Sequence, residues 1–372
     1  MLQRTVIGPT PGAPDAIELL LSHADDGVRV RILRLLTTSK MTNAPLSLPI
    51  LRHVHSNIAL WFRPGGSHER GELLSIIRRL LIRLRGGASA LEKTASSSTL
   101  DLELLNAHKD FVAALIASVV AELRPNASYQ RHIMGLSILR YLLESKIDRC
   151  DRSLVQTSNH PDWPFSLCLR QADIAQDLLD LVSDAYEDVR ALSASILSYL
   201  LASGPNAHSQ LFSKQLLAAM ELLIPELEAE AAQTNRNDQA DGLGRCYSLC
   251  ASTQRCAFDS GQPAKARPVV LELLDRLDQL FTARPIFDKP DSQPLHSLLL
   301  GVMYYVEDGN SGLEAQDRVI SISRQVWRAV ADRLCVDSPE TEATNEEDGF
   351  EEVGTGPKDM LSYSWRALRD SR

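Results

Sequence analysis

Apolar residues recur along most of the chain at the three- and four-residue spacing of amphipathic helices. The clearest example is the stretch 178–201, in which an apolar helix ends near Val182, a polar turn follows, and a second helix begins. We expect Asp188 to cap the second helix and Val189 to begin its buried stripe. Arg190 stands one step off the stripe, where it could pair with an acid of a neighbouring repeat. Because one such hairpin cannot bury its own apolar faces, further hairpins are expected on either side.

The first part of the chain contains a relative of this hairpin. Ser22 and Val28-Arg29 match Ser183 and Val189-Arg190 at a constant offset of 161, which suggests an internal repeat. Further helices are predicted at about 67–85, 102–123, 129–143, 213–232, 244–258, 266–283, 294–305 and 314–334. No strand-like alternation of useful length occurs. The pattern therefore predicts an all-α fold, a HEAT/armadillo-like helical-repeat solenoid.

Breaks in the pattern divide the chain further. Residues 1–336 are predicted to form the solenoid, with flexible loops near 86–100, after Gly86-Gly87, and near 233–243. The segment 337–359 is predicted to be a disordered acidic linker, because it contains nine acids, one base and almost no apolar residue. Residues 360–372 are predicted to begin a further helix of the solenoid that is truncated.

Charge and cysteine content narrow the class of protein. The acidic segment contributes −8 of the formal net charge of −9, so the body is near neutral and has no global nucleic-acid signature. Cys246, Cys250 and Cys256 lack a usual zinc spacing and are expected to be buried free thiols. There is no signal-peptide pattern and no apolar run of membrane-spanning length. We therefore predict a cytoplasmic protein with no metal and no membrane partner.

Motifs that would support catalysis are absent from the sequence. It contains no phosphate-binding glycine loop, no nucleophile elbow and no paired histidines at metal-ligand spacing. The carboxylate pairs Asp25-Asp26 and Glu187-Asp188 are more typical of helix caps and of ion pairs between repeats. We therefore predict that the chain is not an enzyme.

One predicted helix is rich in arginine. Leu73, Ile77, Leu80 and Leu84 form its apolar stripe, and arginines crowd its other sides. These are Arg78, Arg79, Arg83 and Arg85. Guanidinium groups in such a double row could bind phosphates, often bidentately. A solvated helix back, with the last arginines complementing the helix dipole, is the alternative.

The C-terminal part carries a family resemblance. The run from Gly356 to Arg369, GPKDMLSYSWRALR, resembles the point at which an acidic linker meets an LSYxWRxLKE-like helix in the thyroid-adenoma-associated protein family. Residues 80–85, Ser128-Tyr129-Gln130-Arg131 and the PLHS run at 294–297 resemble other parts of that family in the same order. The resemblance spans roughly residues 70–372. Family members are much longer, so the chain is expected to be a middle-region fragment.

The resemblance implies a function that the residue pattern alone does not. Fungal members are partner subunits of a tRNA 2′-O-methyltransferase, so the resemblance implies a non-catalytic scaffold that binds this enzyme and helps present the tRNA anticodon loop. S-adenosylmethionine would belong to the partner enzyme, and the arginine helix would contact RNA. The tail residues are expected to be structural; they are Leu361, Tyr363, Trp365, Arg366 and Leu368. A generic protein-binding scaffold, such as a transport or trafficking adaptor without an RNA role, is the alternative.

Overall fold

The computed structural model describes residues 13–63, 65–148, 165–202, 207–234, 236–259, 269–283, 295–307 and 313–334, with the single residues 367 and 369. The chain divides into two compact units, Met1–Asp177 and Leu178–Arg372. Helices make up nearly all of the described residues, and the one β-bridge there joins Asp148 to Phe165. The predicted all-α fold is confirmed. The predicted linker 337–359 and the five tail residues named above lie outside the described residues.

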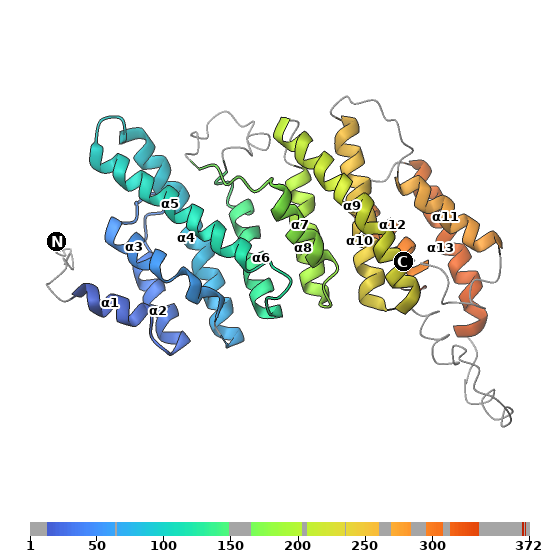
Figure 1. Ribbon diagram of the computed structural model, residues 1–372, viewed down its shortest axis with the longest axis horizontal. Coiled ribbons are helices and arrows are strands. Elements are labelled where there is room, and N and C mark those ends of the chain that lie inside the picture. The colour runs from blue at the N-terminus through green and yellow to red at the C-terminus, as the bar shows by residue number, and fades with distance from the viewer. Residues whose placement is uncertain are drawn as a thin grey trace, which may run out of the picture. The chain divides into compact units, whose positions relative to one another are not determined.

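Unit 1 is built from helix pairs that lie side by side (Figure 1). Its elements are α1 Ala13–Leu21, α2 Asp26–Thr37, α3 Leu48–Ser56, the 3-10 helix η1 Ile58–Phe62, α4 Ser67–Thr94, α5 Thr99–Ala121 and α6 Tyr129–Glu144. Helices α1, α3 and α5 contact one another in succession, and so do α2, α4 and α6. This alternation of two rows is the packing expected of stacked helical hairpins.

Unit 2 follows the same principle. Helix α7, Ala172–Val182, crosses the boundary between the units, and the remaining elements are α8 Glu187–Ala202, α9 Ala207–Thr234, α10 Asn237–Asp259, α11 Val269–Ala283, α12 Leu295–Glu307 and α13 Leu313–Leu334. Helix α10 is central, because it packs on α8, α9, α11 and α12. The approach of α10 to α12 is close: a Cβ on Gly244 would lie 2.7 Å from Cβ of Leu300.

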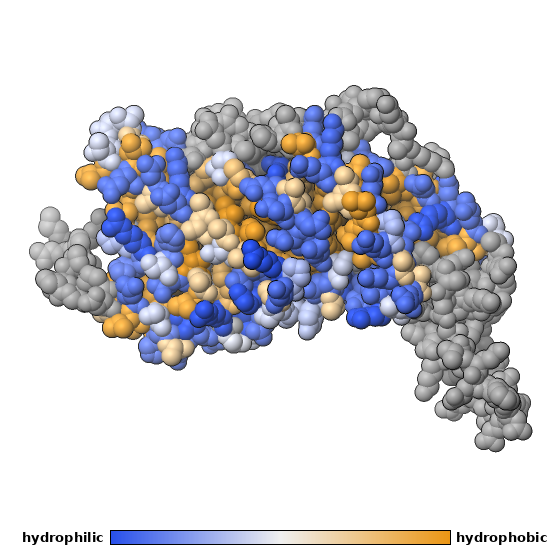
Figure 2. Space-filling model, in the orientation of Figure 1, coloured by the Kyte–Doolittle hydropathy of each residue, from blue (hydrophilic) through white to orange (hydrophobic). Residues whose placement is uncertain are grey.

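The apolar stripes have the burial that their spacing predicts. All four members of the α4 stripe, Leu73, Ile77, Leu80 and Leu84, are at most 2% exposed. Hydrophilic and hydrophobic residues are interspersed on the face shown in Figure 2. Exposed large apolar side chains include Leu35 in unit 1 and Leu222 in unit 2.

Helix α5 is the one described helix that is long and apolar enough to cross a membrane by length and composition alone. The sequence analysis had expected no such segment. In the fold, α5 packs on α3, α4 and α6 and buries Phe111, Leu115 and Val119. These contacts are those of a core helix in unit 1.

The predicted internal repeat is present in the structure. Helix α1 ends at Leu21 and α2 begins at Asp26, whereas α7 ends at Val182 and α8 begins at Glu187. Both pairs of boundaries are 161 residues apart, the offset found in the sequence.

The same arginine closes both turns. Arg29 donates hydrogen bonds from Nη1 to the carbonyl oxygens of residues 23 and 24, at 2.5 and 3.1 Å. Arg190 donates in the same way to residues 184 and 185, at 2.8 and 3.0 Å. We name this arrangement the turn clamp. It explains why arginine recurs at this position. The valine before it is fully buried in the second repeat, Val189, and half-buried in the first, Val28.

The helix caps match the prediction in one repeat and differ in the other. Asp25 caps α2, because its Oδ1 accepts a hydrogen bond from the backbone N–H of Val28 at 3.0 Å. Asp188 is not the N-cap of α8. This helix begins at Glu187, so Asp188 lies inside its first turn. An acid there still complements the positive end of the helix dipole.

The predicted loop near 86–100 is wrong, because α4 continues through Gly86 and Gly87 to Thr94 and only four residues separate it from α5. A Cβ on Gly86 would lie 2.4 Å from the carbonyl oxygen of Thr42, and one on Gly87 would lie 2.9 Å from Cα of Pro45. The glycines therefore let the segment 42–45 lie directly against the helix. That contact, with Leu91 buried in the following turn, offsets the cost of glycine in a helix.

The predicted loop near 233–243 is also replaced by helix. Helix α9 runs to Thr234 and α10 begins at Asn237, so the break is two residues long. The polar residues of this segment were predicted to form a loop. Asp238 instead lies in the first turn of α10, where acids favour helix formation.

Candidate nucleic-acid interface

Two of the four predicted RNA-binding arginines face solvent. Arg78 and Arg79 are exposed on α4. The guanidinium of Arg78 lies 5.6 Å from the ring centroid of Tyr141 and 4.0 Å from the carboxylate of Glu144, both on α6. Arg79 donates a hydrogen bond to the hydroxyl of Ser75 at 2.9 Å. Both guanidinium groups keep donors that could bind a phosphate.

Arg83 points to the protein rather than to solvent. It donates to the backbone carbonyl oxygens of Thr37 at 2.7 Å, Ala44 at 3.0 Å and Pro45 at 3.4 Å. Partial burial lowers the pKa of its guanidinium. Arg83 therefore fastens the α2–α3 connection to α4, beside the two glycines described above.

Arg85 is likewise engaged within unit 1. It donates from Nη1 to the backbone carbonyl oxygen of Ser145, just after α6, at 2.8 Å. The structure thus divides the four arginines of the predicted double row: Arg83 and Arg85 hold backbone carbonyls, and Arg78 and Arg79 lie on the surface.

A buried histidine completes the attachment of the α2–α3 connection. His108 of α5 is fully buried, and its Nε2 lies 3.3 Å from the backbone nitrogen of Leu46. Its Nδ1 lies 2.8 Å from the carbonyl oxygen of Leu104. The neutral ring with the proton on Nδ1 satisfies both contacts, donating to Leu104 and accepting from Leu46. Burial lowers the pKa of His108, and the charge of Arg83 acts in the same direction.

This pKa shift predicts how stability depends on pH. Because the pKa of His108 is lower in the folded chain than its ordinary value of about 6.5, the unfolded chain binds the proton first as the pH falls. The free energy of unfolding should therefore decrease from about pH 6.5 downward until the pKa of the folded state is passed. In His108→Gln this part of the slope should disappear, as measured by urea unfolding at a series of pH values.

The matched control is His68→Gln, since the side chain of His68 is 86% exposed. That variant should keep the wild-type slope. If both variants had the same slope as the wild type, the proposed role of His108 would be incorrect.

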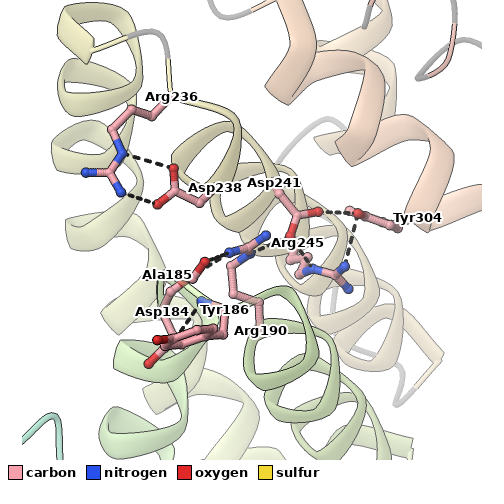
Figure 3. A network of polar contacts seen from close by, with 9 residues as sticks. All are labelled: Asp184, Ala185, Tyr186, Arg190, Arg236, Asp238, Asp241, Arg245 and Tyr304. Carbon is pink, nitrogen blue, oxygen red and sulfur yellow. Dashed lines mark hydrogen bonds and ion pairs between the residues drawn. The ribbon is translucent and has the colours of Figure 1, made fainter. Parts of the chain in front are cut away.

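Unit 2 contains a buried network of charges centred on Asp241 of α10 (Figure 3). Its carboxylate accepts hydrogen bonds from Arg190 of α8 at 2.5 Å, from Arg245 at 3.0 Å, and from the hydroxyl of Tyr304 on α12. Arg245 also lies over the Tyr304 ring, 4.4 Å from its centroid. The network therefore joins three helices of unit 2 through one carboxylate.

The electrostatics of this network keep Asp241 ionised. Burial by itself would raise the pKa of the carboxyl, but the charge of Arg245 and the hydrogen bonds from Tyr304, Arg190 and Arg245 lower it overall. Burial, followed by the bond to Asp241, raises the pKa of the Tyr304 hydroxyl, which stays protonated as a donor. The partners of the Asp241 carboxylate come from α8, α10 and α12, so the network ties these three helices together.

Sequence reasoning found part of this network. The pairing of Arg190 with an acid of another repeat is confirmed. Asp241, Arg245 and Tyr304 were missed, although the i, i+4 spacing of Asp241 and Arg245 was a usable signal.

No group of three metal-ligating side chains occurs within the described part of the chain. Cys246 and Cys250 are buried, as predicted, and burial raises their thiol pKa values to about 12 and about 11. The side chain of Cys256 lies outside the described residues. Thiols with such pKa values remain protonated and unreactive near neutral pH.

Comparison with known proteins finds similarity to one family. A family model described as "Trm732, TPR repeats" matches residues 12–191. The tRNA (32-2'-O)-methyltransferase regulator trm732 of Schizosaccharomyces pombe is 25% identical to the chain over 380 residues, covering 95% of the chain and 24% of the relative. The chain therefore spans about a quarter of the length of this curated relative. The family description names TPR repeats where the sequence analysis expected HEAT-like ones, and both are stacks of helical hairpins. The chain is thus similar to the Trm732 family in its N-terminal half and to one of its curated members over nearly its whole length, in agreement with the THADA-like resemblance of its C-terminal motif.

Proposed function

We propose that this chain is part of a non-catalytic regulator that binds a tRNA ribose 2′-O-methyltransferase and helps present the tRNA anticodon loop. The observation that carries the proposal is the similarity, over 95% of the chain, to a protein named as a regulator of a tRNA (32-2'-O)-methyltransferase. Stacked helical hairpins suit this role, because they offer an extended surface to a large ligand. S-adenosylmethionine belongs to the partner enzyme, and the complex works in the cytoplasm.

On this proposal the arginines of α4 have two different roles. Arg78 and Arg79 contact RNA phosphates, since both are exposed and carry available donors. Arg83 and Arg85 act indirectly, by holding neighbouring backbone segments against α4. RNA is recognised largely through its backbone and shape, which suits contacts of this kind.

The proposal predicts the loss of one ribose methylation. In cells that lack the full-length gene product, the 2′-O-methyl group at position 32 of the target tRNAs should be lost, and re-expression should restore it. Site-resolved mapping of ribose methylation measures this. An unrelated modification in the same tRNAs should not change and serves as the control. If the methylation map were unaltered, the protein-binding scaffold without an RNA role would become the better description.

A further inference from the structure

Exposed arginines lie on three neighbouring helices of unit 1 that are distant in sequence. Arg31 and Arg34 are exposed on α2, Arg78 and Arg79 on α4, and Arg140 on α6. We call these five residues the basic ridge. Helix α4 contacts both α2 and α6, so the three helices are direct neighbours. The sequence analysis identified only the α4 pair.

Ion pairs between helices connect three members of the basic ridge. Arg34 of α2 lies 2.7 Å from Glu72 of α4, and Arg78 of α4 lies 4.0 Å from Glu144 of α6. Arg140 lies 2.7 Å from the same Glu144 carboxylate. Each helix of the row thus shares a charged contact with the next.

The basic ridge has an excess of positive charge. Two carboxylates, Glu72 and Glu144, contact three of its five arginines, so five positive charges face two negative ones. Among the described residues, Arg31 and Arg79 have no carboxylate partner. The body as a whole, without the acidic segment 337–359, is near neutral, so this concentration of positive charge is local.

The chemistry of the basic ridge fits a phosphate backbone. All five bases are arginines, whose planar guanidinium groups bind phosphates bidentately and cannot be neutralised by deprotonation. Neighbouring helices pack roughly 8–10 Å apart, so three helices spread the arginines across roughly 16–20 Å. That width matches several consecutive phosphates better than one small anion.

We propose that the basic ridge binds the sugar–phosphate backbone of the tRNA, with Arg31, Arg34 and Arg140 acting beside Arg78 and Arg79. This inference rests on the proposed function for the identity of the RNA. It adds that recognition extends over three helices, and that Glu72 and Glu144 hold the arginines in position while reducing the net charge. Contacts of this kind position the RNA without reading its sequence.

The test measures RNA binding directly, without the methyltransferase. The full chain is titrated onto an unmodified, fluorescently labelled tRNA transcript at several salt concentrations between 50 and 200 mM. In Arg78→Gln/Arg79→Gln and in Arg31→Gln/Arg34→Gln, the affinity should fall about tenfold and the salt slope by about 1 for each arginine removed.

The matched control is Arg52→Gln/Arg124→Gln, which makes the same charge change at exposed positions on α3 and just after α5, outside the α2–α4–α6 row. This variant should bind RNA within about twofold of the wild type. If it weakened binding as much as the ridge variants, only net charge would matter, and the basic ridge would not be a site.

A variant that is expected to increase RNA affinity separates an electrostatic effect from misfolding. Glu144→Gln removes the carboxylate that contacts Arg78 and Arg140, so it should strengthen RNA binding about threefold. Damage to the fold would weaken binding instead. Unchanged binding in Glu144→Gln would overturn the proposal, as would weaker binding in a variant whose urea unfolding matches the wild type. A polyglutamate peptide that competes as well as tRNA would also overturn it.

The two proposals can fail independently. If methylation at position 32 depends on the protein but the ridge variants bind tRNA normally, the regulator function stands and the ridge assignment is wrong. If the ridge variants lose tRNA binding while the methylation map is unaltered, the surface binds RNA for another purpose.

Discussion

Asp241→Asn is expected to lower the free energy of unfolding of unit 2 by about 3–5 kcal/mol, because it leaves two buried arginines without their shared carboxylate. The side chains of Arg190 and Arg245 are 6% and 12% exposed, so water compensates little of the lost charge. The bond from Tyr304 loses its charged acceptor in the same substitution. The loss should appear as faster hydrogen exchange in peptides from α8, α10 and α12, measured by mass spectrometry.

Asp238→Asn is the matched control, since it makes the same change in the first turn of the same helix. Asp238 pairs with Arg236 at 2.7 Å, and the side chain of Arg236 is 60% exposed. Exposed ion pairs contribute little to stability, so hydrogen exchange should change far less than in Asp241→Asn. Equal effects of the two variants would mean that burial does not set the strength of the network.

Gly86→Ala is expected to destabilise unit 1 by about 1–3 kcal/mol, as overpacking does in other proteins. The added Cβ would meet the backbone of Thr42 and Asn43, and neither can rotate away as a side chain would. Because Arg83 holds the same α2–α3 connection, the strain should spread to α2. Urea unfolding, with hydrogen exchange of peptides from α2 and α4, measures both effects.

Gly71→Ala, in the same helix, is expected to have the opposite sign. A Cβ on Gly71 would meet no atom within 4 Å, so alanine gains helix propensity without a clash. The free energy of unfolding should rise by about 0.5–1 kcal/mol. Destabilisation in both variants would show that glycine itself, rather than the contact with residues 42–45, matters at these positions.

Hydrophobic periodicity was sufficient to predict the helices and their pairing. The α4 stripe is a pattern of residues close in sequence, and so is each of the two hairpins that recur 161 residues apart. The stripe and the repeated hairpin are both present in the structure. Arg190 was placed correctly for the same reason, since its position next to Val189 directs it away from the core stripe. Local spacing carries this information because each hairpin forms mainly from its own residues.

Periodicity failed where a residue serves a contact that is distant in sequence. Gly86 and Gly87 were interpreted as the end of a helix, but segment 42–45 uses the space that they leave. Arg83 was placed in a phosphate-binding row for a similar reason, because the carbonyl groups that it binds lie 38 to 46 residues earlier. The sequence pattern of α4 alone contains no signal for that loop.

The candidate site was predictable only within one helix. Arg78 and Arg79 stand out because they are adjacent in an arginine-rich segment. Arg31, Arg34 and Arg140 are scattered, and only the packing of α2 and α6 against α4 brings them to the same surface. The family resemblance was found in the tail motif, whereas the family model matches residues 12–191, at the other end of the chain.

The two turn clamps differ in where their balancing acid comes from, and this affects how far each hairpin can be treated as a module. Arg29 pairs with Asp26 of its own helix, so the α1–α2 hairpin carries its own neutralising charge. Arg190 pairs with Asp241, more than fifty residues further along. The first hairpin could therefore be duplicated or exchanged between relatives as a single piece. The second can be inherited only together with α10, so substitutions at positions 190 and 241 should be coupled as the family diverges.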